Sequence, residues 1–499
     1  MFGLEFDVSA TNVQVWLLCT VAFLLAYNYF TKESWRKLPP GPPAFPLVGS
    51  LPFLGKDIRE PLRKMSAKYG DVFTIYLGYR RVVILNGYDV IREAFAKHGH
   101  RFSGRPLIYM ITGVMDGYGI VSSQGWLWRE QRRHALTVLR DFGFGGTLLE
   151  ERITTELRFF LDELRNNKDK PYNPQMLIQM SVANVIAALA FGNRLHYDDD
   201  KFVYYIEKIN KAFEILGNSG IITIFPFLRH LPGDYFRVKQ LLMDRDEMAA
   251  YLKEIVEDHK IAMKEGRPIK DFITVYLKKL EEERNKTDST FSEKQLIYIT
   301  IDLFGAGSET VSTTLTWAIV YMALNQDVQQ RVQAEIDDVI GRESVPRMAN
   351  RERMPFTEAC ILEIQRLGDV VPFAVPHATT EDIQFRGYLI PRGTMVMANL
   401  YGVHRDPHLW PEPEKFKPER FLDENGKLVR REELIPFCLG KRLCLGASMA
   451  RMELFLYFTS ILQRFSFQLS PDHRQSDLRG KLTVTNMPRP PCYIILQER

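Results

Sequence analysis

The stretch Phe437-Cys-Leu-Gly-Lys-Arg-Leu-Cys-Leu-Gly446 decides how the rest of this sequence is interpreted. Gly440 and Gly446 flank Cys444 and permit a turn in which a flat ligand approaches the backbone. Arg442 supplies a cation two residues before the thiol. A helical pattern starts just after Cys444, and the amide donors of its first turn are directed toward the sulfur. Together these features favour a thiolate, as a haem iron with an axial sulfur ligand requires. The alternative is an inert buried cysteine in a glycine-rich turn.

Composition excludes several classes of protein. Of the 499 residues, 45% are hydrophobic and 25% are charged, so the chain is neither disordered nor collagenous. The 65 Lys and Arg against 61 Asp and Glu leave a net charge of +4, too little for nucleic-acid binding through bulk charge. Five cysteines without paired spacing argue against a disulfide framework and indicate a reducing compartment for the catalytic part.

Apolar periodicity predicts a body that is mainly α-helical with small β-sheets at its edges. Residues 72–77 and 81–85 are expected to form a hairpin, and 383–385, 388–390 and 394–398 are expected to be further short strands. Spacing of 3.6 residues predicts helices over 151–165, 175–191, 202–216, 235–264, 293–323, 327–340, 356–367 and 446–463.

The amino terminus is predicted to be a membrane anchor. Residues 8–31 carry no charge and are long enough, as a helix, to cross the hydrocarbon layer of a bilayer. Glu5 and Asp7 disfavour a cleaved signal peptide, which has a basic start. Lys32, Arg36 and Lys37 follow the span and place the body on the cytoplasmic side.

Three domains are therefore expected: an anchor over 1–31, a basic and proline-rich hinge over 32–49, and a catalytic body over 50–499. The hinge contains Leu38-Pro-Pro-Gly-Pro-Pro43, a stiff extended segment with one pivot at its glycine. The stretch 221–228 is expected to be an apolar loop, either touching lipid or folded into the core.

Phe437 to Gly446 resembles the Phe-x-x-Gly-x-Arg-x-Cys-x-Gly signature of the cytochrome P450 superfamily. Further motifs in family order, including Leu38-Pro-Pro-Gly-Pro42, Phe102-Ser-Gly-Arg105 and Pro376-His377, make the chain most similar to the microsomal family-two clan. The resemblance implies the P450 fold, haem b (iron protoporphyrin IX) as cofactor and Cys444 as the iron ligand.

Ala306-Gly-Ser-Glu-Thr310 matches the family's oxygen-activating segment within a long helical pattern. Small residues leave room for dioxygen, while Glu309 and Thr310 are expected to hold and relay protons. Taken alone, a threonine in an apolar helix more often bonds to its own helix carbonyl. A dinucleotide loop at Gly305-x-Gly307 is rejected because the surroundings are helical.

Two further groups of residues follow from the resemblance. The Glu-x-x-Arg pair Glu363 and Arg366 is expected to engage Arg420 of Pro418-Glu-Arg-Phe421 as a buried structural lock. The haem propionates are expected to be held by Arg105, Trp128, Arg132, His377 and Arg442.

The family's substrate-contact regions carry over to the stretch 107–120 and to later segments. The expected pocket residues are Ile108, Ile120, Leu303, Ala306, Val371, Phe373, Ala374, Val375, Asn486 and Met487. Because most are apolar, a lipophilic substrate is expected, such as a fatty acid, terpenoid, steroid or xenobiotic. Oxygen from O2 would enter it by hydroxylation or epoxidation.

Electrons are expected from a partner, because the sequence offers no flavin or nucleotide site. The resemblance implies NADPH–cytochrome P450 reductase, with cytochrome b5 as a second candidate, at the endoplasmic reticulum membrane. A basic docking face is expected from Arg129, Arg133, Arg140, Lys441 and Arg451, although solvated surface arginines are the alternative.

Three other functions differ from a monooxygenase in what they require of the sequence. A haem-thiolate isomerase or sensor would dispense with the Glu309 and Thr310 pair. A membrane-tethered scaffold would need no haem signature. A metal hydrolase would need metal-ligand spacing, but His98-x-His100 and His404-x-x-x-His408 are the only close histidine pairs, and Pro407 interrupts the second.

Overall fold

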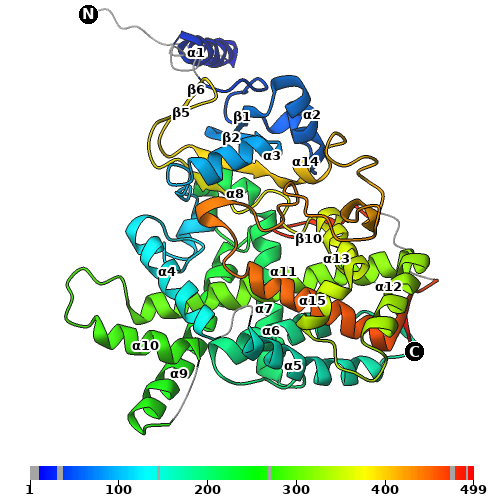
Figure 1. Ribbon diagram of the computed structural model, residues 1–499. Helices are drawn as coiled ribbons and strands as arrows, with labels where there is room; N and C mark the ends of the chain where they lie inside the picture. The colour runs from blue at the N-terminus through cyan, green and yellow to red at the C-terminus, as the bar shows by residue number, and fades with distance from the viewer. Residues whose placement is uncertain (1–9, 31–37, 143–145, 268–270, 472–477, 490–492) are drawn as a thin grey trace, which may run out of the picture.

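The computed structural model describes residues 10–30, 38–142, 146–267, 271–471, 478–489 and 493–499. Helices form most of this part of the chain, and short strands gather into small sheets (Figure 1). The mainly α-helical fold class is therefore confirmed.

The α-helices are α1 (Ala10–Phe30), α2 (Arg59–Tyr69), α3 (Tyr88–Arg92), α4 (Gly125–Asp141), α5 (Thr147–Arg165), α6 (Gln175–Ala190), α7 (Asp200–Asn218), α8 (Gly220–Ile224), α9 (Val238–Lys264), α10 (Phe272–Glu282), α11 (Glu293–Leu324), α12 (Gln326–Val339), α13 (Pro355–Gly368), α14 (Leu400–His404) and α15 (Ala447–Arg464). The π-helices are η3 (Glu93–Lys97) and η4 (Tyr109–Gly113). The 3-10 helices are η2 (Leu51–Phe53), η5 (Pro226–His230), η6 (Met348–Arg353), η7 (Pro418–Phe421) and η8 (Gly440–Arg442). The strands are β1 (Val72–Leu77), β2 (Arg80–Asn86), β3 (Pro171–Tyr172), β4 (His377–Ala378), β5 (Ile383–Phe385), β6 (Tyr388–Ile390), β7 (Met395–Asn399), β8 (Phe465–Leu469), β9 (Lys481–Leu482), β10 (Asn486–Met487) and β11 (Ile494–Glu498).

Helix α11 forms the centre of the helical body. Ser292 caps its first turn by accepting a hydrogen bond from the amide of Gln295 at 3.1 Å. Its residues are apolar on nearly all sides, and every one from Val311 to Ala323 is buried. A helix that is hydrophobic all round belongs in a core, and α11 packs against α6, α13, α15 and β8.

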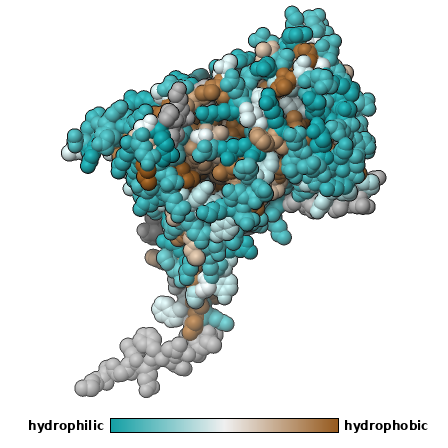
Figure 2. Space-filling view, turned by 90° about the horizontal axis from the view of Figure 1, so that it is seen from below, coloured by the Kyte–Doolittle hydropathy of each residue, from teal (hydrophilic) through white to brown (hydrophobic). Residues whose placement is uncertain are grey.

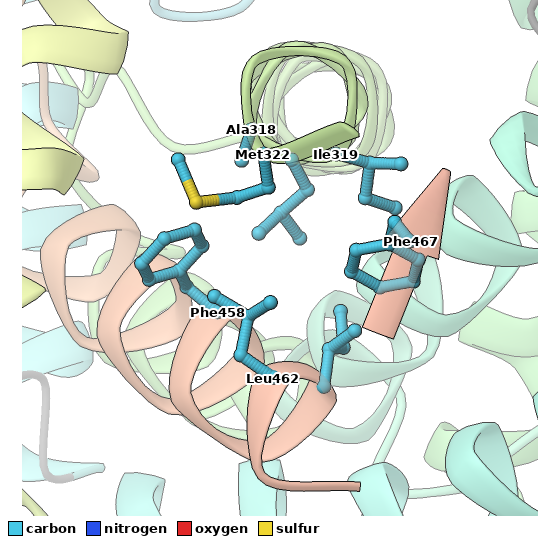
Figure 3. A pocket seen from close by; sticks show the side chains of 8 residues that line it. Ala318, Ile319, Met322, Phe458, Leu462 and Phe467 are labelled. Atoms are coloured by element: carbon cyan, nitrogen blue, oxygen red, sulfur yellow. The ribbon is translucent and has the colours of Figure 1, made fainter. Parts of the chain in front are cut away.

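A void between α11, α15 and β8 shows how tightly these elements meet (Figure 3). Its volume is about 10 Å³, and Ala318, Ile319, Met322, Phe458, Leu462 and Phe467 are among its side chains. That space is at the lower limit for one water, and no polar side chain lines it. The void therefore belongs to the packed core rather than to a binding site.

The four-stranded sheet has the order β1-β2-β7-β4, in which β2 and β7 are parallel and the other pairs antiparallel. Alternate residues point to opposite faces, so Phe73 and Ile75 join one apolar cluster while Val72 joins another. Both faces of this sheet are consequently covered. The β1–β2 hairpin occurs as predicted, and the predicted strands β5 and β6 pair with each other as a second hairpin.

Two predicted segments differ from expectation. The stretch 221–228 is not a loop, because most of it forms α8 and part of η5, with Ile222 and Ile224 buried and Ile221 and Phe227 exposed. The predicted pivot at Gly41 is held against β1, where a Cβ atom would lie 1.8 Å from the carbonyl oxygen of Thr74. That glycine therefore serves close packing and not free rotation.

Helix α1 lies within the segment predicted to be an anchor, and its described side chains, residues 13–24, are exposed. Across the described residues, no helix combines the length and apolarity required to cross a membrane. The basic residues Lys32, Arg36 and Lys37 lie outside the described residues. On the face shown in Figure 2, hydrophilic residues predominate and hydrophobic residues form separate patches.

Candidate active site

The loop around Cys444 is closed by a backbone hydrogen bond from the Cys444 amide to the Phe437 carbonyl at 3.1 Å. Gly440 adopts a φ of +78°, and a Cβ atom there would lie 1.7 Å from the carbonyl oxygen of Phe95. This glycine therefore packs the loop on η3. Gly446 has open space where a Cβ would stand, so only the second glycine leaves room for a ligand.

Cys444 lines a large cavity and is exposed to it, although protein surrounds the thiol on its other sides. Burial raises the pKa of this thiol, while a hydrogen bond with the Gly446 backbone and the charges of Arg132 and Arg451 act in the opposite direction. Without a bound cation, burial therefore favours the protonated thiol, and the thiolate stays a prediction for the protein with its metal bound. A metal ion on the sulfur would supply the missing positive charge.

The cavity has a volume of about 310 Å³, by the same measure that gives about 10 Å³ for the void in the core. Its walls are α11 on one side and the Cys444 loop with α15 on the other, and the segment 370–375 and β4 complete it. We call this space the cofactor pocket. Its lining is mainly apolar, with cationic side chains and a second thiol, Cys438, among the polar groups.

Arg105, Arg132 and Arg442 line the cofactor pocket and form no ion pair within the described residues. Arg442 donates to the carbonyls of Ser103, Ile120 and Ser123 at 2.9, 3.1 and 2.7 Å. Burial, together with repulsion from the other two arginines, lowers the pKa of Arg442 to about 8, and burial lowers that of Arg105 to about 10. Buried or half-buried cations that lack an ion-pair partner fit an anionic ligand.

Trp128 supports the same conclusion. Its indole Nε1 is buried yet has no hydrogen-bond partner, and the guanidinium of Arg442 lies 3.8 Å from the ring centroid. A buried donor without a partner is unusual and indicates a missing acceptor. An indole donor beside three guanidinium groups and one accessible thiol fits an iron porphyrin that carries two carboxylates.

The predicted role of His377, as a donor to a haem propionate, requires a change in its protonation state. Its Nδ1 lies 2.7 Å from the Phe102 carbonyl, the ring stacks on Phe95, and burial lowers its pKa to about 3. A neutral ring that donates from Nδ1 presents a lone pair at Nε2. His377 must therefore gain a proton before it can donate to a carboxylate.

Thr310 and Glu309 are separated by the helix that carries them. Thr310 lines the cofactor pocket, and its hydroxyl donates to the Ala306 carbonyl at 3.0 Å. Glu309 is buried outside the pocket lining, accepts from Thr485 at 3.0 Å and Gln179 at 3.2 Å, and has a pKa raised by burial. Adjacent helical residues point about 100° apart, which explains the separation.

Asp302 is a pocket residue that the sequence reasoning missed. It lies two turns before Thr310 on α11 and accepts from the amides of Ile120 and Val121 at 2.6 and 2.9 Å. Burial raises its pKa to about 6, although those amides and Arg105 oppose the shift. Its spacing from Ala306 and Thr310, at i+4 and i+8, was the available signal.

The predicted substrate residues divide into two groups. Six of them line the cofactor pocket: Ile120, Leu303, Ala306, Val371, Ala374 and Val375. Ile108 and Phe373 pack instead in the apolar cluster beside the sheet, and Met487 lies in β10. Asn486 is occupied by contacts with Gly368, Arg59 and Trp317. These four residues are not part of the pocket wall.

The predicted pairing of Glu363, Arg366 and Arg420 is present. Glu363 accepts two hydrogen bonds of 2.8 Å from Arg366 and one of 3.2 Å from Arg420. Both members of the first pair are 0% exposed. The lock lies between α13 and η7, away from the pocket lining.

The histidine pairs offer no metal centre. His404 is buried between Asp369, 3.0 Å from its Nδ1, and the amide of Ile435, which donates to Nε2 at 3.1 Å. Among the described residues, no group of three or more His, Cys, Asp or Glu side chains is arranged to hold a metal ion. A single cysteine ligand to a haem iron needs no such group.

The predicted docking residues Arg129, Arg133, Arg140, Lys441 and Arg451 are all exposed. None of them forms an ion pair with another described residue, and Arg451 lies 4.9 Å from the ring centroid of Phe437 beside the Cys444 loop. A cationic surface at this loop is therefore present, while its partner stays a prediction.

Comparison with known proteins agrees with this geometry. The sequence profile of the family Cytochrome P450 matches residues 39–495. Human cytochrome P450 2U1 is 38% identical, over 95% of this chain and 92% of its own. Rabbit (Oryctolagus cuniculus) cytochrome P450 2B4 is 40% identical, over 96% and 98%, and chicken (Gallus gallus) cytochrome P450 2H2 is 38% identical, over 95% and 97%.

Proposed function

Because this chain belongs to the cytochrome P450 family and is a haem monooxygenase, we propose that it inserts one oxygen atom from O2 into a lipophilic substrate. The second oxygen leaves as water, with two electrons and two protons consumed per turnover. The observation that carries the assignment is the cofactor pocket, in which one accessible thiol faces the apolar side of α11 while unpaired cations lie at its edge.

Bound haem supplies the activation of dioxygen. Cys444 would hold its iron through Sγ, and Arg105, Trp128, Arg132 and Arg442 would hold its carboxylates. Their backbone hydrogen bonds fix the guanidinium groups before the ligand arrives, which lowers the ordering cost of binding. His377 would join them once protonated.

On the opposite wall, Ala306 and Gly307 leave space, and the Thr310 hydroxyl would hold a proton donor at Oγ1. Glu309 would act at a distance, by exchanging protons with the polar residues that surround it. The apolar lining would exclude water and position a carbon-rich substrate.

We further propose the endoplasmic reticulum membrane as the location, with residues 1–31 as the anchor, 32–49 as the hinge and 50–499 as the catalytic body. The exposed apolar side chains of α1, which include Trp16, Leu18 and Phe23, support membrane contact. NADPH–cytochrome P450 reductase would dock on the basic residues beside the Cys444 loop, with cytochrome b5 as a second candidate.

A matched pair of cysteine variants tests the iron ligand. Cys444→Ser should abolish the absorption spectrum of a thiolate-ligated ferrous CO complex, because no sulfur remains on the iron. Cys438→Ser should retain that spectrum, although Cys438 lines the same pocket. The reverse pattern would overturn the assignment.

Oxygenated product formed only with NADPH and reductase would separate a monooxygenase from an isomerase or sensor.

A further inference from the structure

Glu453 lies on α15 and lines the cofactor pocket, yet the function described above does not use it. Its residue is 1% exposed. Met449, Ala450 and Leu454, which lie within four positions of it on the helix, line the same pocket. This spacing places all four residues on one helix face, directed at the space that receives the cofactor.

The carboxyl group of Glu453 lacks the partners that buried carboxylates normally have. Its Oε1 is buried without a hydrogen bond, and no ion pair involves Glu453 within the described residues. Burial alone raises its pKa well above the ordinary value, with no neighbouring charge contributing. An isolated buried carboxylate is strongly disfavoured, so burial favours the uncharged acid.

The titratable groups around Glu453 do not neutralise it. On its own helix, Tyr457 lies one turn later, and its hydroxyl pairs with Ser181 of α6 at 2.7 Å. On α5, the carboxylate of Glu156 is engaged by Arg194 and Tyr197. The remaining titratable groups of the pocket wall are Arg105, Arg132, Asp302, Asp369, His377, Cys438, Arg442 and Cys444.

We propose that Glu453 is a positioning residue for electron transfer: an uncharged carboxylic acid at the wall of the cofactor pocket whose ionisation lowers the electron affinity of the haem iron. The proposal rests on haem occupying the cofactor pocket. It assigns to this chain a proton site distinct from the Thr310 side of the pocket.

The sign of the effect follows from charge. Reduction adds one negative charge to the cofactor, which stabilises the protonated form of a nearby acid and raises its pKa. Between the pKa of the oxidised protein and that of the reduced protein, each electron is accompanied by one proton on Glu453. Over that interval the midpoint potential falls by about 59 mV per pH unit, equivalent to a tenfold change in the equilibrium constant.

Spectroelectrochemical titration of the full-length holoprotein from mildly acid to alkaline pH tests this coupling. The wild-type midpoint potential should be constant at low pH and fall in the alkaline range, whereas Glu453→Gln should remove that alkaline component. Thr459→Val is the control, because Thr459 is buried on the same helix outside the pocket lining, and it should match the wild type. Superimposable wild-type and Glu453→Gln curves would overturn the proposal.

An infrared measurement on the reduced-minus-oxidised holoprotein provides a second test that does not depend on the variant's activity. The wild type should show a carboxylic C=O band that shifts in D2O and is absent from Glu453→Gln, while Thr459→Val retains it. If Glu453→Gln fails to bind haem, Tyr457→Phe should displace the band, because Tyr457 lies one helical turn from Glu453 and interacts with it electrostatically. A wild-type spectrum without any protonated carboxyl band overturns the proposal, while a normal CO spectrum would leave the Cys444 assignment intact.

Discussion

Two arginine clusters in this protein differ in whether their charge is balanced by the chain itself. In the lock, Glu363 neutralises Arg366 and also pairs with Arg420, with both members of the first pair 0% exposed. In the cofactor pocket, three guanidinium groups donate hydrogen bonds to backbone carbonyls but have no ion-pair partner among the described residues; they belong to Arg105, Arg132 and Arg442. The difference teaches that buried cations paired within the chain stabilise the fold, whereas buried cations left unpaired indicate a ligand's charge.

The largest effect is expected from breaking the balanced cluster. Glu363→Ala leaves two buried guanidinium groups without a counter-charge and should cost about 3–5 kcal/mol of unfolding free energy. Urea denaturation measures it. Glu419→Gln is the control, because Glu419 forms an exposed pair with Arg331 at 2.8 Å that is expected to contribute about 0–1 kcal/mol. Equal losses in both variants would contradict the buried lock.

The next largest effect is expected from Asp302, the carboxylate beside the pocket cations, on the pH dependence of the unfolding free energy. The pKa of Asp302 is raised from 3.8 to about 6, so its contribution to stability is full below pH 3.8 and is lost as the pH rises through 6. Each pKa unit corresponds to about 1.36 kcal/mol, so the loss is on the order of 3 kcal/mol. Asp302→Asn should remove this pH dependence of the unfolding free energy.

Asp116→Asn provides the comparison for Asp302, because Asp116 is an exposed carboxylate that pairs with Lys294 at 3.1 Å. The unfolding free energy of Asp116→Asn should depend on pH in the same way as that of the wild type. A wild-type stability that rises between pH 4 and pH 6 relative to Asp302→Asn would show that the sign is wrong.

A smaller effect is expected from removing one unbalanced cation. Within the described part of the chain, Arg132 makes a single hydrogen bond, to the Leu443 carbonyl, so Arg132→Met should change the stability of the haem-free protein little. Loss of a charged hydrogen bond to a haem carboxylate, about 1.5–3 kcal/mol, should speed haem transfer to apomyoglobin by about 10- to 100-fold. Arg133→Met alters the exposed neighbour and should leave the transfer rate unchanged.

The smallest effect is expected on the rate of haem release when Trp128 is replaced. Because its Nε1 has no protein partner, Trp128→Phe breaks no hydrogen bond in the haem-free chain. Haem release should still accelerate several-fold, as a neutral hydrogen bond contributes about 1 kcal/mol. Trp126→Phe, at a 57% exposed position of the same helix, is the matched control. Unchanged release from Trp128→Phe would mean that the indole donor does not face the ligand.

Local sequence patterns predicted most elements well because their signals are short in range. The β1–β2 hairpin follows from alternation around a glycine, and α11 from a continuous apolar pattern. The stretch 221–228 was mispredicted because Pro226 signalled a loop, whereas burial of Ile222 and Ile224 stabilises a short helix before it. Tertiary burial overrode local propensity there.

Motif spacing also identified the residues of the site, but it did not predict in which direction their side chains point. Thr310 and Glu309 are neighbours in sequence, yet only Thr310 lines the pocket. Gly440 looked like a ligand-facing glycine, although its missing Cβ accommodates the Phe95 carbonyl. Asn486 matched a substrate region, but its amide is held by Arg59 and Gly368. Such directions depend on contacts between distant segments.

The sequence by itself determined the thiol, the family motif and the helical class, because each is encoded within one turn or one periodic segment. Tertiary structure alone decided which charges are balanced. Glu363 meets Arg420 from 57 positions away, while Arg442 meets carbonyls more than 300 positions distant and no carboxylate. Charge balance depends on spatial neighbours and on the loss of water between them, and the order of residues along a chain specifies neither directly.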